Sequence, residues 1–289
     1  MKKVYLLIVI PLALFACKKD DLTPSWLVIN EFDFTTNESI QGPNSEGITD
    51  AWVYMDNEAL GVFSLPARIP ILAEGKHDFT IYAGIKINGI SATRTRYPFY
   101  ERYDAEIDLV RDVEVEIAPT ITYKSNVQFQ LLEDFEDVGI DFEKDIISDT
   151  NINIITAGTH PDIVKYGNSC GMINLSQDDS TYKGTTNTNL NLPRNEDVYV
   201  EIDYMNVNSF ALGVVAKGPG GTNEHTPLVI MNAQDESDLQ WKKIYIALQD
   251  DVSYELNATS YEIYLLSILD ADKTDAIIYI DNIKVLRYD

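Results

Sequence analysis

Apolar and polar residues alternate through most of the chain after residue 25, and the spacing of amphipathic helices is scarce. In segment 26–34 the apolar residues recur mostly at every second position, which is the period of a half-buried β-strand. The same pattern predicts strands over residues 51–55, 60–63, 77–83, 90–97, 102–109 and 113–117. Asp56-Asn57-Glu58 and Asn88-Gly89 are typical of tight hairpin turns. We therefore predict one β-sandwich over residues 25–120.

The second half of the chain continues with short strand-like segments. They cover residues 152–156, 170–175, 198–205, 211–216, 228–231, 241–248, 260–269 and 276–286. Gly218-Pro219-Gly220-Gly221 and residues 270–275 are predicted as loops between some of them. So many short strands predict a jelly roll over residues 132–289, with residues 121–131 as a linker. The predicted fold class is all-β, with two β-sandwich domains.

The first residues have the pattern of an export signal. Met1-Lys2-Lys3 is basic, residues 4–15 are apolar, and Ala16-Cys17 follows. The apolar run is shorter than the roughly 20 residues that a membrane-spanning helix needs. Its end, Leu14-Phe15-Ala16-Cys17, resembles the lipobox of bacterial lipoproteins, which implies a signal peptide over residues 1–16 and a fatty-acylated Cys17 (palmitate or a similar chain). The alternative is an ordinary signal peptide in which a cysteine stands there by chance.

The residues that follow Cys17 bear on the compartment. Lys18-Lys19-Asp20-Asp21 resembles the export signal of Bacteroidota lipoproteins, a lysine followed by acidic residues close to the acylated cysteine. The resemblance implies a lipid anchor in the outer membrane and a protein that faces the cell exterior, with residues 17–24 as the lipidated tether. Stable attachment needs two or more acyl chains, because one chain binds only marginally. The alternative is a charged tether without a sorting role, which leaves the protein facing the periplasm.

Composition excludes one class of partner and one source of stability. The 289 residues include 46 Asp and Glu against 22 Lys and Arg, for a formal net charge of −24. Because nucleic acids are bound through basic surfaces, we expect no nucleic-acid partner. The chain has 2 cysteines, so acylation of Cys17 leaves Cys170 without a disulfide partner. No histidine stands near Cys170 in the sequence, which predicts a small buried residue and not a nucleophile.

Parts of the predicted first domain resemble a known module. The pieces are Val53-Tyr54-Met55-Asp56-Asn57, Leu60-Gly61, Pro66 and the run over residues 72–81. Together they resemble the PEGA-type module of bacterial surface proteins, a small Ig-like or prealbumin-like sandwich. Ala83-Gly84-Ile85 departs from the usual end of the motif, so only the architecture is carried over. The resemblance implies a spacer or an interaction domain.

The second domain resembles the galactose-binding-like jelly roll that many carbohydrate-binding modules use. The resemblance rests on Leu132-Glu133-Asp134-Phe135-Glu136, residues 167–172, residues 241–246 and the terminal run over residues 278–285. It implies a structural calcium, held by Glu136 or Glu133 together with Asp281 and a backbone carbonyl near Cys170, since Ca²⁺ prefers oxygen ligands. The alternative is that these acids are hydrogen-bonded residues at strand ends.

A sugar site usually combines an aromatic face with carboxylates and amides. Strand alternation over residues 199–204 places Tyr199, Glu201 and Asp203 on one face, which we predict to line an open concave sheet. Tyr245 and Tyr264 on later strands are predicted to extend this ligand-binding face. The alternative is the ordinary polar outer face of an antiparallel sheet.

Catalysis has little support in the sequence. The common hydrolase, metalloprotease and phosphate-binding motifs are missing, and His77, His160 and His225 are scattered. We therefore predict a non-catalytic, surface-exposed lipoprotein of the outer membrane that binds glycan through its C-terminal jelly roll. The alternative is a structural or adhesive subunit of an outer-membrane transport, secretion or motility assembly, with an outer-membrane protein as its partner. A groove with exposed aromatic residues favours glycan, and a flat patch favours protein.

Overall fold

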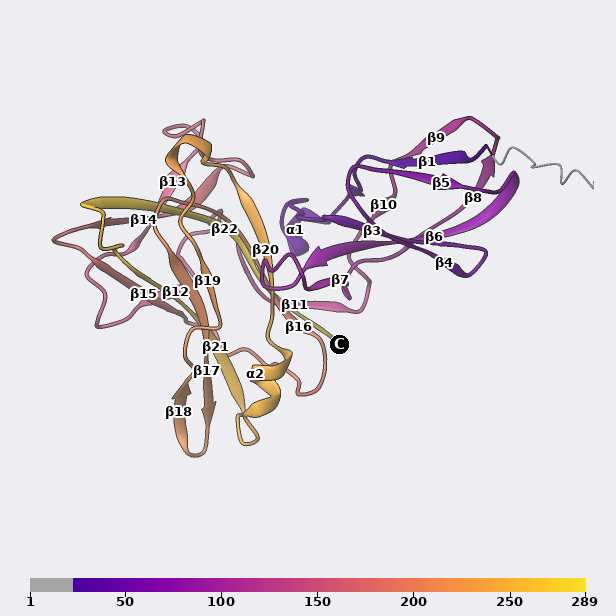
Figure 1. Ribbon diagram of the computed structural model, residues 1–289. Helices are drawn as coiled ribbons and strands as arrows, with labels where there is room; N and C mark the ends of the chain where they lie inside the picture. The colour runs from indigo at the N-terminus through magenta and orange to yellow at the C-terminus, as the bar shows by residue number, and fades with distance from the viewer. Residues whose placement is uncertain (1–22) are drawn as a thin grey trace, which may run out of the picture.

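The computed structural model describes residues 23–289, which form two β-sandwiches that lie side by side (Figure 1). The all-β fold class with two sandwiches is confirmed. The predicted signal peptide, Cys17 and Lys18-Lys19-Asp20-Asp21 lie outside the described residues. Within residues 23–289, no helix has both the length and the apolar character to cross a membrane.

The first sandwich is built from two main sheets and a short strand pair. One sheet has the order β5 (Ala67–Ile71), β1 (Ser25–Ile29), β9 (Glu114–Ile117). The other has the order β4 (Glu58–Ser64), β3 (Asp50–Met55), β6 (Gly75–Lys86), β7 (Arg94–Arg96), and β8 (Tyr103–Leu109) also pairs with β6. β2 (Asp33–Phe34) pairs with β10 (Thr120–Ile121), and the short helix α1 (Glu38–Gln41) follows β2. The segment 26–34 is therefore two strands, β1 and β2, and not one.

Both predicted turns are present, but only the first is a tight hairpin: Asn88 and Gly89 lie within the longer connection between β6 and β7, whose register ends at Lys86 and Arg94. Asp56 and Asn57 have φ angles of 51° and 66°, as a two-residue turn between right-twisted strands requires. Asn88 and Gly89 also have positive φ angles, of 54° and 70°. The strand after the second turn is shorter than predicted, because β7 covers only Arg94–Arg96.

Strand β5 is missing from the sequence prediction. It contains Pro70, and Pro66 precedes it, and proline is uncommon inside strands. β5 lies at the edge of its sheet and pairs only with β1. Proline lacks a backbone donor, and an edge position tolerates that loss.

The second sandwich has two larger sheets. One has the order β13 (Ile152–Thr156), β14 (Ser169–Ser176), β22 (Asp275–Tyr288), β16 (Val198–Asn206), β20 (Lys242–Ala247), with β11 (Val127–Glu133) on β22. The other has the order β12 (Phe142–Lys144), β15 (Thr181–Thr186), β21 (Ser260–Ile268), β17 (Phe210–Gly218), β18 (Gly221–Glu224), with β19 (Val229–Met231) on β17. Along the chain, the 3₁₀ turn η1 (Glu236–Asp238) stands between β19 and β20, and the helix α2 (Gln249–Tyr254) stands between β20 and β21.

All strands predicted for this half are present. β11, β12, β15 and β18 were not predicted; β15, for example, has the sequence Thr-Tyr-Lys-Gly-Thr-Thr, which contains no aliphatic residue. The segment predicted as a linker contributes to both sandwiches, because β10 ends in it at Ile121 and β11 begins in it at Val127. No free linker separates the two sandwiches.

The two cores meet at the junction between the sandwiches. The core of the second sandwich lies between its two sheets and includes Val200 and Ile202. The core of the first sandwich extends onto the outer face of the second, where it includes Tyr199, Tyr245 and Leu286. A parallel bridge between Ile87 and Tyr245 adds a direct backbone connection. This continuous packing joins the sandwiches by buried apolar and aromatic surface.

Candidate functional site at the domain junction

The predicted sugar-binding face of β16 is covered by the first sandwich. Alternation along the strand is as predicted, since Val200 and Ile202 point into the core of the second sandwich. Tyr199, Glu201 and Asp203 point the other way, but they are only 6%, 0% and 2% exposed. The expectation that this face lines an open concave sheet is therefore wrong. A sequence pattern distinguishes the two faces of a strand, but it does not reveal what packs against each face.

Glu201 instead anchors a buried polar network across the junction. Its carboxylate accepts hydrogen bonds from the hydroxyls of Tyr97 at 2.6 Å and Tyr123 at 2.9 Å, both from the first sandwich. Lys243 Nζ lies 3.0 Å from the same carboxylate. Burial alone raises the pKa of Glu201, but the charges of Lys243 and Lys284 and the bond from Tyr97 bring that pKa below its ordinary value. Glu201 is therefore ionised and structural.

Tyr245 and Tyr264 do not share one face. The hydroxyl of Tyr245 lies 3.0 Å from that of Tyr100 and accepts a hydrogen bond from Gly47 N at 2.9 Å, so Tyr245 belongs to the junction network. Tyr264 lies on β21 in the opposite sheet, and its hydroxyl donates to the carbonyl of His225 at 2.7 Å. The prediction that both tyrosines extend the β16 face is wrong for Tyr264, because β21 and β16 belong to different sheets.

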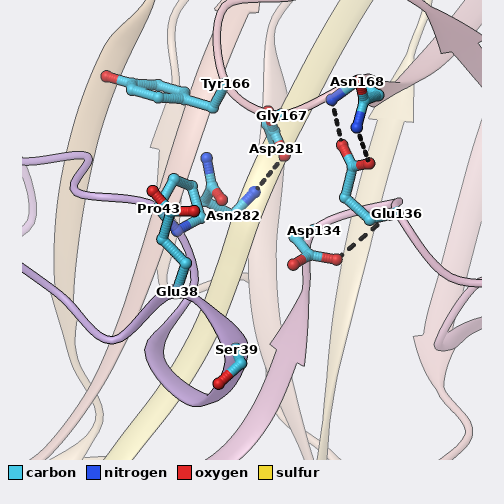
Figure 2. Close-up of a pocket in the computed structure, with 10 residues that line it drawn as sticks. All are labelled: Glu38, Ser39, Pro43, Asp134, Glu136, Tyr166, Gly167, Asn168, Asp281 and Asn282. Carbon is cyan, nitrogen blue, oxygen red and sulfur yellow. Dashed lines mark hydrogen bonds between the residues drawn. The ribbon is translucent and has the colours of Figure 1, made fainter.

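The junction also contains a cavity of about 460 Å³, which we call the acidic junction pocket. Glu38 and Pro43, on and just after α1, line it from the first sandwich. The second sandwich supplies Asp134, Glu136, Tyr166, Asn168, Asp281 and Asn282. Figure 2 shows these side chains around the opening, with Tyr166 and Asn168 on the loop before β14 and Asp281 on β22. The pocket needs both sandwiches, since residues of each form its walls.

Of the two glutamates proposed as calcium ligands, only Glu136 lines this pocket. Its carboxylate accepts hydrogen bonds from the backbone N and from Nδ2 of Asn168, the latter at 3.1 Å (Figure 2). It also accepts from Ser169 N at 2.8 Å. It thereby fixes the loop that carries Asn168. Glu133 accepts instead from the backbone N–H groups of Phe135, at 2.8 Å, and Asp141. Glu133 thus stabilises the turn after β11 and lines a separate cavity.

Asp281 and Asn282 present buried polar atoms without partners. Asp281 is 1% exposed; its Oδ1 accepts from Asn282 N at 2.8 Å, and its Oδ2 has no hydrogen bond. The side-chain oxygen and nitrogen of Asn282 also lack partners. Burial, followed by the charges of Asp203, Asp134 and Glu136, raises the pKa of Asp281 to about 9. Such unpaired groups are costly in a protein interior, and a ligand that supplies hydrogen bonds or positive charge relieves the cost.

Asp281 and Glu136 offer carboxylate oxygens, which a hard cation prefers, but two carboxylates alone do not complete its coordination. The unpartnered oxygen of Asp281 has Glu136 and Asp134 among its anionic neighbours. Among residues 23–289, however, no three acidic, histidine or cysteine side chains converge as a metal cluster. Calcium accepts backbone carbonyls, amide oxygens and water as well as carboxylates. A cation here would therefore be held by Asp281 and Glu136 together with neutral oxygens.

Sequence reasoning named Asp281 and Glu136 but missed Tyr166, Asn168 and Glu38. Tyr166 and Asn168 stand in a loop without strand periodicity. Tyr166 directly precedes the Gly167–Met172 motif that the resemblance used, and Asn168 is part of that motif, but neither was named as a site residue. Glu38 comes from the first sandwich, and no sequence signal connects it to β22. Cys170 is fully buried as predicted, and burial together with the charge of Asp281 raises the pKa of its thiol to about 12.

The chain was compared with known proteins in three ways. No protein-family model matches the chain, and no curated protein matches it in sequence. Solved structures similar to it include the CBM22-1 xylan-binding domain of Paenibacillus barcinonensis, with 14% identity and a TM-score of 0.41 over 57% of this chain and 97% of that chain. A family 11 carbohydrate-binding module of Clostridium thermocellum has 14% identity and a TM-score of 0.37, covering 55% and 94%.

An adhesin domain of Lys-gingipain from Porphyromonas gingivalis is also similar. It has 15% identity and a TM-score of 0.33, covering 55% of this chain and 98% of that chain. The structural neighbours are thus mainly β-sandwich carbohydrate-binding modules. At these identities and TM-scores the likeness does not decide the ligand, which must be argued from the pocket itself.

Proposed function

We propose that this protein is a non-catalytic lipoprotein that binds glycan in the acidic junction pocket. In this proposal Cys17 is acylated, residues 1–16 are removed, and the lipid anchor lies in the outer membrane with the protein facing the cell exterior. The first sandwich acts as a spacer and also supplies one wall of the pocket. The structural neighbours agree with a β-sandwich binding module.

The observation that carries glycan binding is a pocket of suitable size with unmet hydrogen-bonding capacity. Its volume of about 460 Å³ lies within the roughly 300–1,000 Å³ of ordinary ligand sites. Sugar hydroxyls both donate and accept hydrogen bonds, so they match the unpartnered oxygen of Asp281 and the free amide of Asn282. Tyr166 adds a half-buried aromatic ring for the apolar face of a pyranose.

A structural calcium belongs to the same proposal. Asp281 and Glu136 would hold it, and Asn282 Oδ1 is a neutral oxygen without a partner on the same wall. The ion would supply positive charge that keeps Asp281 ionised. Glu136 also holds the loop of Asn168, so the same residue would connect the cation to the glycan-binding wall.

Titration calorimetry and a glycan array on the soluble chain from Asp20 onward test the proposal, with calcium and with chelator. That chain contains every residue of both cores. We expect binding of at least one glycan class, at least tenfold weaker in Tyr166→Ala and Asn168→Ala, consistent with about 1–3 kcal/mol per lost contact. Tyr254→Ala is the matched control, because Tyr254 is 79% exposed outside this pocket. Absence of glycan binding by a folded chain would contradict the proposal and favour the structural or adhesive role.

The anchor is tested separately. Mass spectrometry of the protein from membranes should find an N-terminal Cys17 carrying two or three acyl chains. Protease added to whole cells should degrade it, since the proposal places it on the outer face. A Cys17→Ala variant should be lost from the membrane fraction. An intact leader or a cytosolic protein would contradict this part of the proposal, and protection from protease would place the protein in the periplasm.

A further inference from the structure

A second cavity lies at the domain junction, with aromatic and cationic walls. Its volume is about 410 Å³. Tyr82 and Arg96 line it from the first sandwich, and Asp197 and Tyr199 from the second. Lys124, which follows β10 in the chain, also lines the cavity. We call this cavity the tyrosine junction pocket; it shares no lining residue with the acidic junction pocket.

Arg96 is held in place without using its hydrogen-bond donors. Its guanidinium carbon lies 4.6 Å from the centroid of the Tyr82 ring and 5.9 Å from that of Trp52. Within residues 23–289 its guanidinium makes no hydrogen bond or ion pair to another side chain, and the hydrogen bond from the Thr95 hydroxyl goes to its backbone carbonyl. A guanidinium has five N–H donors in a planar fork that matches a carboxylate. Arg96 is therefore oriented by stacking and open to an anion.

Lys124 adds a second cation with spare capacity. Its ammonium donates to the carbonyl of Pro98 at 2.6 Å and to the hydroxyl of Tyr288 at 3.1 Å. An ammonium has three donors, so one remains. Across the cavity, burial raises the pKa of Asp197, and the charge of Lys124 opposes that rise. Asp197 supplies an acceptor for a ligand hydroxyl.

The geometry points to a carboxylated sugar, a uronic acid residue of an acidic glycan, as the ligand of the tyrosine junction pocket. Tyr82 offers ring surface to the apolar face of a pyranose, and Arg96 with Lys124 offers donors to its carboxylate. Tyr199 is buried and contributes only to the wall of the cavity. A bare phosphate or sulfate would use the cations but not the rings. The chain has a net charge of −24, so long-range attraction of an anion is absent and binding depends on these short contacts. The inference shares with the proposed function only the class of ligand.

Calorimetry on the soluble chain from Asp20 tests the inference with oligogalacturonate and alginate oligomers, neutral galacto-oligosaccharides of equal length, and sulfate. We expect an acidic oligomer to bind, neutral oligomers and sulfate to bind at least tenfold more weakly, and Arg96→Ala to lose at least tenfold in affinity. Arg111→Ala is the charge-matched control, because Arg111 is 59% exposed, is paired with Glu74 and does not line the pocket. It should bind as the unchanged chain does.

Tyr82→Leu keeps side-chain bulk but removes the ring that orients Arg96, so it should also weaken binding of the acidic oligomer. Tyr166→Ala should leave that binding unchanged, which separates this inference from the acidic junction pocket. The inference fails if no acidic oligomer binds, if neutral oligomers or sulfate bind as tightly, or if Arg96→Ala and Arg111→Ala weaken binding equally. Melting curves establish that each variant is folded before it is titrated.

Discussion

Asp203 and Asp281 stand at partner positions on neighbouring strands β16 and β22, and both side chains are almost completely buried. Two carboxylates at such close range cannot both ionise without compensating charge. Lys243 Nζ lies 3.7 Å from Asp203 and compensates that carboxylate. Asp281 has no such partner among the described residues, and burial, followed by the charge of Asp203, raises its pKa to about 9.

The stability of the calcium-free chain should depend on pH through Asp281. Its pKa rises from 3.8 to about 9 on folding, so the folded state holds a proton that the unfolded chain releases. Stability should therefore be greatest below about pH 4 as far as this group is concerned, and fall as the pH rises towards about 9. Thermal unfolding in chelator at a series of pH values measures this dependence. In Asp281→Asn the fall should be smaller.

Calcium should reverse that loss. A bound cation favours the carboxylate of Asp281, so added calcium should raise the melting temperature, and by more near pH 8 than near pH 5. Asp281→Asn should respond weakly or not at all. Asp275→Asn is a suitable control, since Asp275 lies exposed at the start of the same strand. An equal calcium response in chains with Asp281→Asn and Asp275→Asn would rule out the proposed ion site.

Removing the charge of Glu201 should destabilise the protein strongly. Glu201→Gln keeps the shape of the side chain but leaves Lys243 buried without its nearest partner. Breaking one side of a buried ion pair costs about 3–5 kcal/mol of the free energy of unfolding. Glu106→Gln, at an exposed pair with Lys76, should cost far less, because water screens that pair. Denaturant unfolding measures both, and similar losses would contradict the assignment of Glu201 as a buried anchor.

The two sandwiches should unfold as one unit. Tyr199, Tyr245 and Leu286 belong to the second sandwich but pack in the core of the first. Neither sandwich can lose its structure without exposing this shared surface. Calorimetry should show a single transition whose calorimetric and van't Hoff enthalpies agree. Two well-separated transitions would mean that the junction is not cooperative.

Gly213 should be intolerant of a side chain. A Cβ at Gly213 would collide with the ring of Tyr264, its register partner on the neighbouring strand β21. Overpacking of this kind costs about 1–3 kcal/mol of the free energy of unfolding. Gly220→Ala is the matched control, because nothing lies within 4 Å of a Cβ built there. A neutral Gly213→Ala would show that Tyr264 moves away at little cost.

Much of the strand pattern followed from alternation alone. The strands β13, β14 and β16, the turn at Asp56 and Asn57, and the burial of Cys170 were all predicted from neighbouring residues. These features depend on local periodicity and on the backbone preferences of turn residues. β15 was not predicted because its residues, which include no aliphatic side chain, show no clear apolar-polar alternation, and β5 was not predicted because proline is tolerated only at an edge.

The sequence by itself determined which residues share a face: Tyr199, Glu201 and Asp203 do lie together on β16. Only the tertiary structure decided that the first sandwich covers that face, and that Glu38 and Asp281 line one pocket. The reason is that side-chain direction along a strand is a local property with a period of two, whereas the partner of each face depends on contacts between residues far apart in the chain.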